Sequence, residues 1–260
     1  MGLTDRRSSW EESHAVRALV LYPMNALVSD QVGRLRRMIG DKQGSFLDIW
    51  EGVVGNARRP QFGMYTGRTP YAGDTRSTRR DKEYAETLRH DFGELGEEDR
   101  FHLSETGRFP EKKDILSYAD IVTEGEDGWS PLDAEMLMRF EMQRHTPDIL
   151  VTNYSMLQYM LIRATENGIW ENTAKWLERN PKERILLVLD EAHMYKGAAG
   201  GEVALLLKRL AARLGVGMDR FQFIMTSASI PEDHEPVERF FEDMAGRPAS
   251  NLRIITGKEQ

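Results

Sequence analysis

ILLVLDEAHMY, residues 185 to 195, is the stretch that decides the fold of this 260-residue chain. Its apolar run is as long as a strand and ends in two adjacent carboxylates, Asp190 and Glu191. An apolar run without polar alternation is typical of a strand covered on both faces, as in a parallel sheet flanked by helices. In open α/β sheets, ligands gather at the carboxyl ends of the strands. The stretch therefore predicts an α/β domain with a chemical site where this strand ends.

The rest of the chain alternates short apolar runs with amphipathic helical stretches, which favours a mainly parallel sheet with helices on both faces. The predicted strands are Val16–Tyr22, Gln61–Tyr65, Asp148–Thr152, Ile185–Asp190, Phe221–Thr226 and Leu252–Thr256. Mostly apolar residues fall on one helical face in two stretches. The first is Met24, Leu27, Val28, Gln31, Val32, Leu35 and Ile39, and the second is Val203, Leu206, Leu207, Leu210 and Leu214. We expect both helices to pack on the sheet.

An acidic segment, about residues 71–145, interrupts this rhythm. It holds 19 Asp and Glu against 11 Lys and Arg, so its charge of −8 leaves about +1 for the rest of a chain whose total is −7. The negative total therefore does not exclude a nucleic-acid partner elsewhere on the surface. We interpret the segment as a partly ordered insertion, with a helical pattern over residues 130–143.

Composition narrows the class of protein. The chain has no cysteine, which excludes disulfides and thiolate zinc sites. No apolar stretch approaches the roughly 20 residues that cross a bilayer, and the first residues do not resemble a signal sequence. We therefore expect one cytoplasmic domain, residues 1–260, with no membrane partner.

The two carboxylates at the end of the strand suit nucleotide chemistry. Asp190 is placed to hold Mg²⁺ through water beside the phosphates of a nucleotide. Glu191 is then placed to orient or deprotonate the water that attacks the γ-phosphate. The alternative for an isolated Asp-Glu pair is a turn with two solvated acids. The full Asp-Glu-Ala-His sequence behind an apolar strand, which ends at His193, favours the chemical interpretation.

Four motifs in order resemble superfamily 2 DEAD/DEAH-box helicases. DEAH (190–193) and TSAS (226–229) resemble motifs II and III, YPMNALVSDQVGRL (22–35) resembles motif Ia, and PDILVTNYSMLQYML (147–161) resembles motif Ib. The details are most similar to large bacterial helicases of the Lhr/YprA type, some of which serve DNA repair or phage defence. The resemblance implies a first RecA-like motor domain, ATP and Mg²⁺ as cofactors, and a nucleic-acid partner, with DNA favoured over RNA.

The resemblance also implies how the nucleotide site communicates with the nucleic acid. Ser227 and Ser229 are expected to hydrogen-bond toward the DEAH turn, so that His193 and motif III relay the nucleotide state. The family more often has Ser-Ala-Thr here. Serine keeps the hydroxyl and loses only the methyl group.

Nucleic-acid contacts are expected at three points on the strand ends. Asn25, Thr152 and Asn153 precede or begin helices, where backbone amides and small polar side chains hold phosphates. Gly67, Arg68 and Thr69 in YTGRTP resemble the family's G-x-T loop, a further phosphate contact. The alternatives are helix caps for Asn25, Thr152 and Asn153 and a plain turn for the loop.

Two further features of the sequence bear on the predicted nucleic-acid contacts. Met24 stands where many relatives carry threonine, so one hydroxyl contact to the sugar–phosphate backbone of the nucleic acid is lost. Arg34, Arg36 and Arg37 form either a basic patch or the solvated face of an amphipathic helix.

No phosphate-binding sequence G-x-x-x-x-G-K-[ST] occurs in the 260 residues. The resemblance places this Walker A motif just before motif Ia and the second motor domain after residues 252–260, the expected start of the interdomain linker. We therefore expect the chain to be a piece whose phosphate loop comes from the same gene or a split partner. One alternative is a degenerate helicase-like module for nucleic-acid binding or scaffolding. Another is a metal-dependent hydrolase using Asp190, Glu191, His193, Asp233 and His234, but no H-E-x-x-H spacing supports it.

Overall fold

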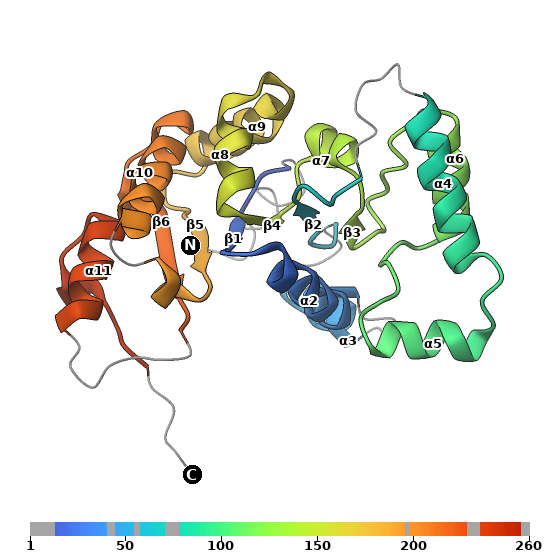
Figure 1. The fold of residues 1–260 in the computed structure, drawn as a ribbon, viewed down its shortest axis with the longest axis horizontal. Helices are drawn as coiled ribbons and strands as arrows, with labels where there is room; N and C mark the ends of the chain where they lie inside the picture. Colours follow the sequence, from blue (N-terminus) through green and yellow to red (C-terminus); the bar gives the residue numbers. More distant parts are fainter. Residues whose placement is uncertain are drawn as a thin grey trace, which may run out of the picture.

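The computed structural model describes residues 14–40, 45–54, 58–70, 78–195, 198–227 and 235–255. Within these residues lies a six-stranded sheet in the order β3-β2-β4-β1-β5-β6, with all neighbours parallel (Figure 1). The strands are β1 (Ala18–Tyr22), β2 (Phe62–Tyr65), β3 (Glu135–Met136), β4 (Ile149–Asn153), β5 (Ile185–Leu189) and β6 (Phe221–Met225). The parallel sheet confirms the predicted RecA-like α/β class.

Helices cover both faces of the sheet (Figure 1). One face carries α2 (Asn25–Leu35) and α3 (Ser45–Val54), and the other carries α7 (Arg139–His145), α8 (Tyr154–Ile162), α9 (Asn167–Arg179) and α10 (Ala198–Arg213). α11 (Glu235–Ala245) packs against α10. Alternation along the strands divides the core between the faces, so that Leu19 and Leu21 join the α8–α10 side whereas Val20 packs near Val28 of α2. None of the described helices is long and apolar enough to cross a bilayer.

Five predicted strands are confirmed, and the sixth is wrong. Residues 252–255 form no strand, and Ile255 is 75% exposed. An apolar β-branched run forms a strand only where a neighbouring strand and a packed face receive it. Thr256 lies outside the described residues. The helix predicted over residues 130–143 is also corrected, because Glu135–Met136 pairs with β2 and α7 begins only at Arg139.

The acidic insertion contains a helical lobe beside β3 (Figure 1). Its helices are α4 (Thr78–Phe92), α5 (Glu97–Glu105) and α6 (Ile115–Thr123). The lobe has a core of its own, which includes Leu88, Phe109 and Tyr118. Lys112 is buried beneath it, in ion pairs with Glu141 and Asp133. The predicted boundaries of the insertion stay a prediction.

Arg36 joins this lobe to the helix of motif Ia. It belongs to a π-helical turn, Arg36–Gly40, directly after α2, and pairs in bidentate fashion with buried Glu135 at 2.7 and 2.8 Å. Gly33 of α2 lies so close to Gly107 that a Cβ on Gly107 would be 2.2 Å from the Gly33 carbonyl oxygen. Of the three arginines considered together in the sequence, Arg36 is therefore a structural anchor rather than part of a patch or a solvated face.

An aromatic cluster joins the segment before β1 to the end of the insertion. The ring of Trp129 stacks on His145 at a centroid distance of 4.3 Å, and the His14 ring meets Trp129 edge-on at 5.3 Å. Burial and the positive charge of Arg58 lower the pKa of His14 to about 4. His14 is therefore neutral in the folded protein at neutral pH.

This pKa shift predicts acid destabilisation that begins above the range in which carboxylates titrate. An unfolded histidine has a pKa of about 6.5, so between pH 6.5 and 4 the unfolded chain binds a proton that the folded chain excludes. The stabilising contribution is complete above this range and is lost as the pH falls through it. We expect His14→Phe to reduce the drop in unfolding free energy between pH 7 and pH 5 by about 1 to 2 kcal/mol. Urea titrations measure it; an equal reduction in His90→Phe, whose side chain is 89% exposed, would contradict the assignment.

Candidate functional site: the DEAH turn and the carboxyl ends of the strands

The DEAH turn is held at the carboxyl edge of the sheet by its neighbours. The Asp190 amide donates to the Leu21 carbonyl of β1 at 3.1 Å, and the Ala192 amide donates to the Thr226 carbonyl after β6 at 2.8 Å. Glu191 has φ of 52°, the only left-handed backbone among the described non-glycine residues. Such backbone strain concentrates at functional sites. The turn therefore presents both carboxylates where ligands gather in α/β sheets.

Side chains of motif III contact the DEAH turn. The Ser227 hydroxyl lies 3.3 Å from Nδ1 of His193, which itself lies 3.2 Å from a carboxylate oxygen of Glu191. The structure thus brings Ser227 and His193 together; Ser229 lies outside the described residues. The Thr226 hydroxyl donates to the Asp190 carboxylate, a contact the sequence analysis missed. The contact follows from the register of β5 and β6, in which Leu189 pairs with Met225, so that Thr226 lies opposite Asp190.

Burial shapes the electrostatics around these carboxylates. Burial raises the pKa of Tyr22 and of Tyr195, and the negative charge of Asp190 raises both further. Oε2 of Glu191 is buried 3.2 Å from Nδ1 of His193, and within the described residues the buried hydroxyl of Tyr195 makes no hydrogen bond. Two adjacent carboxylates fit hydrated Mg²⁺, a cation that prefers oxygen ligands and keeps its water. The described residues form no protein-only cluster of three or more metal ligands.

The polar residues predicted for motif Ib have roles within the fold. The Thr152 hydroxyl is buried and donates to the Tyr65 carbonyl at 2.5 Å, which fastens β4 to β2. Asn153 is the N-cap of α8, and its side-chain oxygen accepts the Met156 amide at 2.8 Å. A phosphate contact at Asn153 stays a prediction.

The other predicted contacts divide between exposed and buried positions. α2 begins at Asn25, whose side chain lies outside the described residues, and Met24 before it is 52% exposed. This exposure corrects the expectation that Met24 packs on the sheet. Gly67 is exposed, whereas Thr69 is buried and its hydroxyl donates to the Met64 carbonyl at 2.6 Å.

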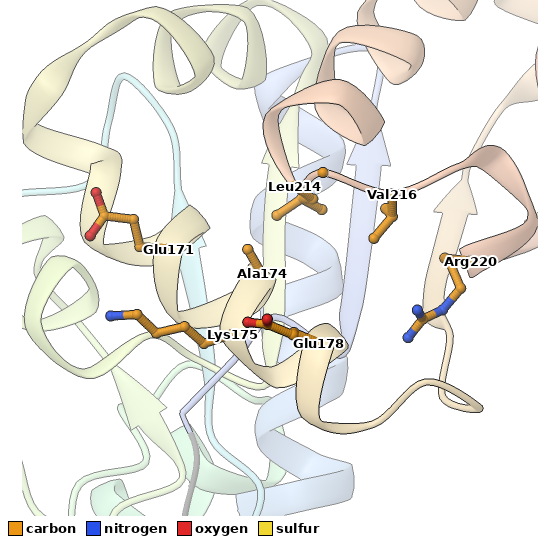
Figure 2. A pocket seen from close by; sticks show the side chains of 8 residues that line it. Glu171, Ala174, Lys175, Glu178, Leu214, Val216 and Arg220 are labelled. Carbon is orange, nitrogen blue, oxygen red and sulfur yellow. The ribbon is translucent and has the colours of Figure 1, made fainter.

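A pocket of about 510 Å³ lies at the amino ends of the strands, opposite the DEAH turn (Figure 2). Glu171, Lys175 and Glu178 of α9 line it, facing the turn after α10. Arg220, which closes it beside the start of β6, donates to the backbone carbonyls of Leu177, Asn180 and Glu183 at 2.8 to 3.0 Å. Its position at the amino ends of the strands and the structural role of Arg220 separate this pocket from the DEAH site.

The parallel sheet with an Asp-Glu turn at its carboxyl edge defines a RecA-like domain of the kind that binds nucleotides at this edge. Residues 117–237 match the family model described as DEAD/DEAH box helicase. The matched residues include the DEAH turn and Ser227.

Two relatives extend the match. The chain is 41% identical over 270 residues to Druantia protein DruE of Escherichia coli strain UMEA 4076-1. The alignment covers 94% of this chain and 14% of DruE. It is 30% identical over 109 residues to the uncharacterized ATP-dependent helicase MJ1574 of Methanocaldococcus jannaschii, covering 42% of this chain and 15% of that protein. The chain thus spans about one seventh of each relative.

One solved structure is also similar. It is the crystal structure of the DUF1998 helicase MrfA, which aligns with 90% of this chain and 22% of its own, at 18% sequence identity and a TM-score of 0.41.

Proposed function

We propose that the chain is part of the first motor domain of an ATP-dependent helicase or translocase acting on nucleic acid, with DNA favoured. The observation that carries the proposal is the junction of the DEAH turn with motif III. Thr226 contacts Asp190 and Ser227 contacts His193. A change in position of the carboxylates would therefore be transmitted directly to the residues that follow β6. Coupling of this kind is what a motor needs to link nucleotide state to its track.

The roles of the individual residues follow from their chemistry. Asp190 would hold Mg²⁺ through water, and Glu191 would position the attacking water. ATP and Mg²⁺ together supply the leaving group and the neutralisation of its charge. Ser227 and His193 would report the nucleotide state. Since phosphoryl transfer depends on positioning and electrostatics, the fixed turn at Glu191 suits it.

The outermost strand β6 supports the proposal that a further protein segment packs on this sheet. β6 is an edge strand in the described sheet, and on the α2 side Ile224 is 43% exposed beside Val188 of β5. Parallel sheets normally have both faces covered. We propose that a Walker A segment and a second motor domain, from the same gene or a split partner, complete the nucleotide site.

The alternative function is a degenerate module that binds nucleic acid without hydrolysing ATP. Both functions require nucleic-acid binding at the carboxyl edge of the sheet, and only the first requires Glu191 for turnover.

The test shared by both functions is binding of the 260-residue chain to labelled single-stranded DNA, measured by fluorescence anisotropy. We expect weak binding that falls as salt rises, because one domain offers only part of a track. The double variant Asn25→Ala/Asn153→Ser should weaken binding about tenfold or more, since each residue lost is worth roughly a hydrogen bond to a charged phosphate.

Serine keeps the N-cap of α8, so the variant is expected to melt like the wild type. RNA of the same sequence is the comparison for DNA preference. Wild-type chain that binds neither polymer at low salt would contradict the function, and unchanged binding in the double variant would contradict the site.

A further inference from the structure

The turn after β2, Thr66–Thr69, is closed by hydrogen bonds of its own. The Thr69 amide donates to the Thr66 carbonyl at 3.2 Å, and the Thr66 amide donates to the Thr69 hydroxyl at 2.9 Å. The Arg68 amide donates to the Thr66 hydroxyl at 3.2 Å. Both threonines are buried, and the proton of Thr69 goes to Met64. Because a hydroxyl has one proton to donate, the Thr69 side chain has none left for a phosphate.

The tip of this turn presents one cation. Gly67 and Arg68 are exposed, and a Cβ on Gly67 would meet no atom within 4 Å. Within the part of the chain that the structure describes, the Arg68 guanidinium makes no ion pair and no hydrogen bond. A guanidinium offers a planar set of donors that matches the oxygens of a phosphate. The closed turn therefore holds a phosphate-binding group away from the sheet.

The insertion braces this turn from beneath through Arg139 of α7. The Arg139 guanidinium donates to the Thr66 carbonyl and lies 5.3 Å from the centroid of the Tyr65 ring, and its backbone amide donates to the Pro70 carbonyl at 3.2 Å. Arg139 thus contacts the residue before the turn, the first residue of the turn and the residue after it.

Tyr65 is itself fixed on three sides. Its buried hydroxyl donates to Glu166 and accepts from Gln143, both at 2.8 Å, and its carbonyl accepts the Thr152 hydroxyl. The network runs from the insertion, through β2, to the end of β4 and the segment after α8. A turn held this firmly presents Arg68 in one place.

The strand order puts Arg68 in line with the proposed nucleic-acid contacts. Tyr65 pairs with Thr152, and Asn153 pairs with Tyr22. The carboxyl ends of β2, β4 and β1 therefore lie side by side, about 4.8 Å apart. Arg68 extends the row formed by the first residues of α8 and α2.

We infer that Arg68 contacts a backbone phosphate of single-stranded nucleic acid and that Arg139, supplied by the insertion, is the positioning residue that holds its turn. The inference rests on the proposed function and adds a charged contact to it. It also gives the insertion a purpose, because the only described guanidinium that holds this turn comes from α7.

The experiment measures anisotropy of a labelled single-stranded DNA on the full 260-residue chain over a series of salt concentrations. Arg68→Ala is expected to weaken binding about three- to tenfold at low salt and to reduce the slope of log affinity against log salt by about 0.7. Arg68→Lys should keep the slope, since it keeps the charge. The matched control is Arg100→Ala, which removes an exposed arginine from α5 and should change neither quantity.

Arg139→Met tests the positioning role, because methionine keeps an apolar stem over Tyr65 and loses the donors to Thr66. It should weaken binding like Arg68→Ala, and the double variant should be no weaker than either single variant. A purely structural role for Arg139 would instead give additive losses and an unchanged salt slope.

The outcomes separate the two proposals. If the wild type binds with a clear salt slope and Arg68→Ala behaves like Arg100→Ala, the inference is overturned while the proposed function stands. If the wild type binds no nucleic acid, the proposed function itself fails. Thermal melts of each variant establish folding, and the Arg68 variants, which change an exposed tip, decide the phosphate contact even if Arg139→Met does not fold.

Discussion

Replacing Asp148 by alanine is expected to lower the free energy of unfolding by about 3 to 5 kcal/mol. Asp148 is 1% exposed and lies just before β4. It pairs with Arg17 before β1 and with Arg58 before β2, and it accepts the Gln61 amide at 2.9 Å. Removing the carboxylate takes the Asp148 charge away from two buried guanidinium groups, which costs far more than the pair itself contributes.

Equilibrium urea unfolding measures this loss. The matched control is Asp120→Ala, because Asp120 pairs with Arg89 at the surface, where its side chain is 71% exposed. Exposed pairs contribute about 0 to 1 kcal/mol, so the control should stay close to the wild type. Equal effects of the two substitutions would show that the cluster at the amino ends of β1, β2 and β4 is not a charge-dependent clamp.

Glu191→Gln is expected to reduce ATP turnover by at least about 100-fold in a protein that combines this chain with a Walker A segment and a second motor domain. Glutamine fills the same space and keeps a hydrogen-bonding group, but it does not take a proton from water. Nucleotide binding should therefore be retained while turnover is lost. The 260 residues by themselves should not turn over ATP, because two carboxylates repel a polyphosphate unless a lysine and a ring of amides hold it.

Phosphate release with nucleic acid present measures both expectations. Glu178→Gln is the matched control, since Glu178 lines the pocket at the other edge of the sheet and should leave turnover unchanged. Turnover by the 260 residues alone that disappears in Glu191→Gln would show that the Walker A loop is dispensable. A combined protein that binds nucleic acid yet never hydrolyses ATP would support the degenerate module instead.

The candidate site was predictable from sequence where a motif depends on its neighbours along the chain. Asp190 and Glu191 follow a strand that any parallel sheet would bury, and their position at its carboxyl end needs no knowledge of the rest. Ser227 was predicted to approach the DEAH turn because TSAS resembles motif III of the helicase family. Thr226 was missed, since its contact with Asp190 depends on the register between β5 and β6.

By itself, the sequence determined the α/β class, five of the six predicted strands and the location of the DEAH turn, because apolar runs and their spacing act locally. Only the tertiary structure decided which polar groups form hydrogen bonds and ion pairs within the fold. Thr69 and Thr152 look like ligand contacts in the sequence, yet their hydroxyls serve the backbone of β2. Arg36 looks solvated, yet it pairs with Glu135, 99 residues away. Such pairings join residues far apart in sequence, and a chain reveals them only when the sheet brings its distant strands together.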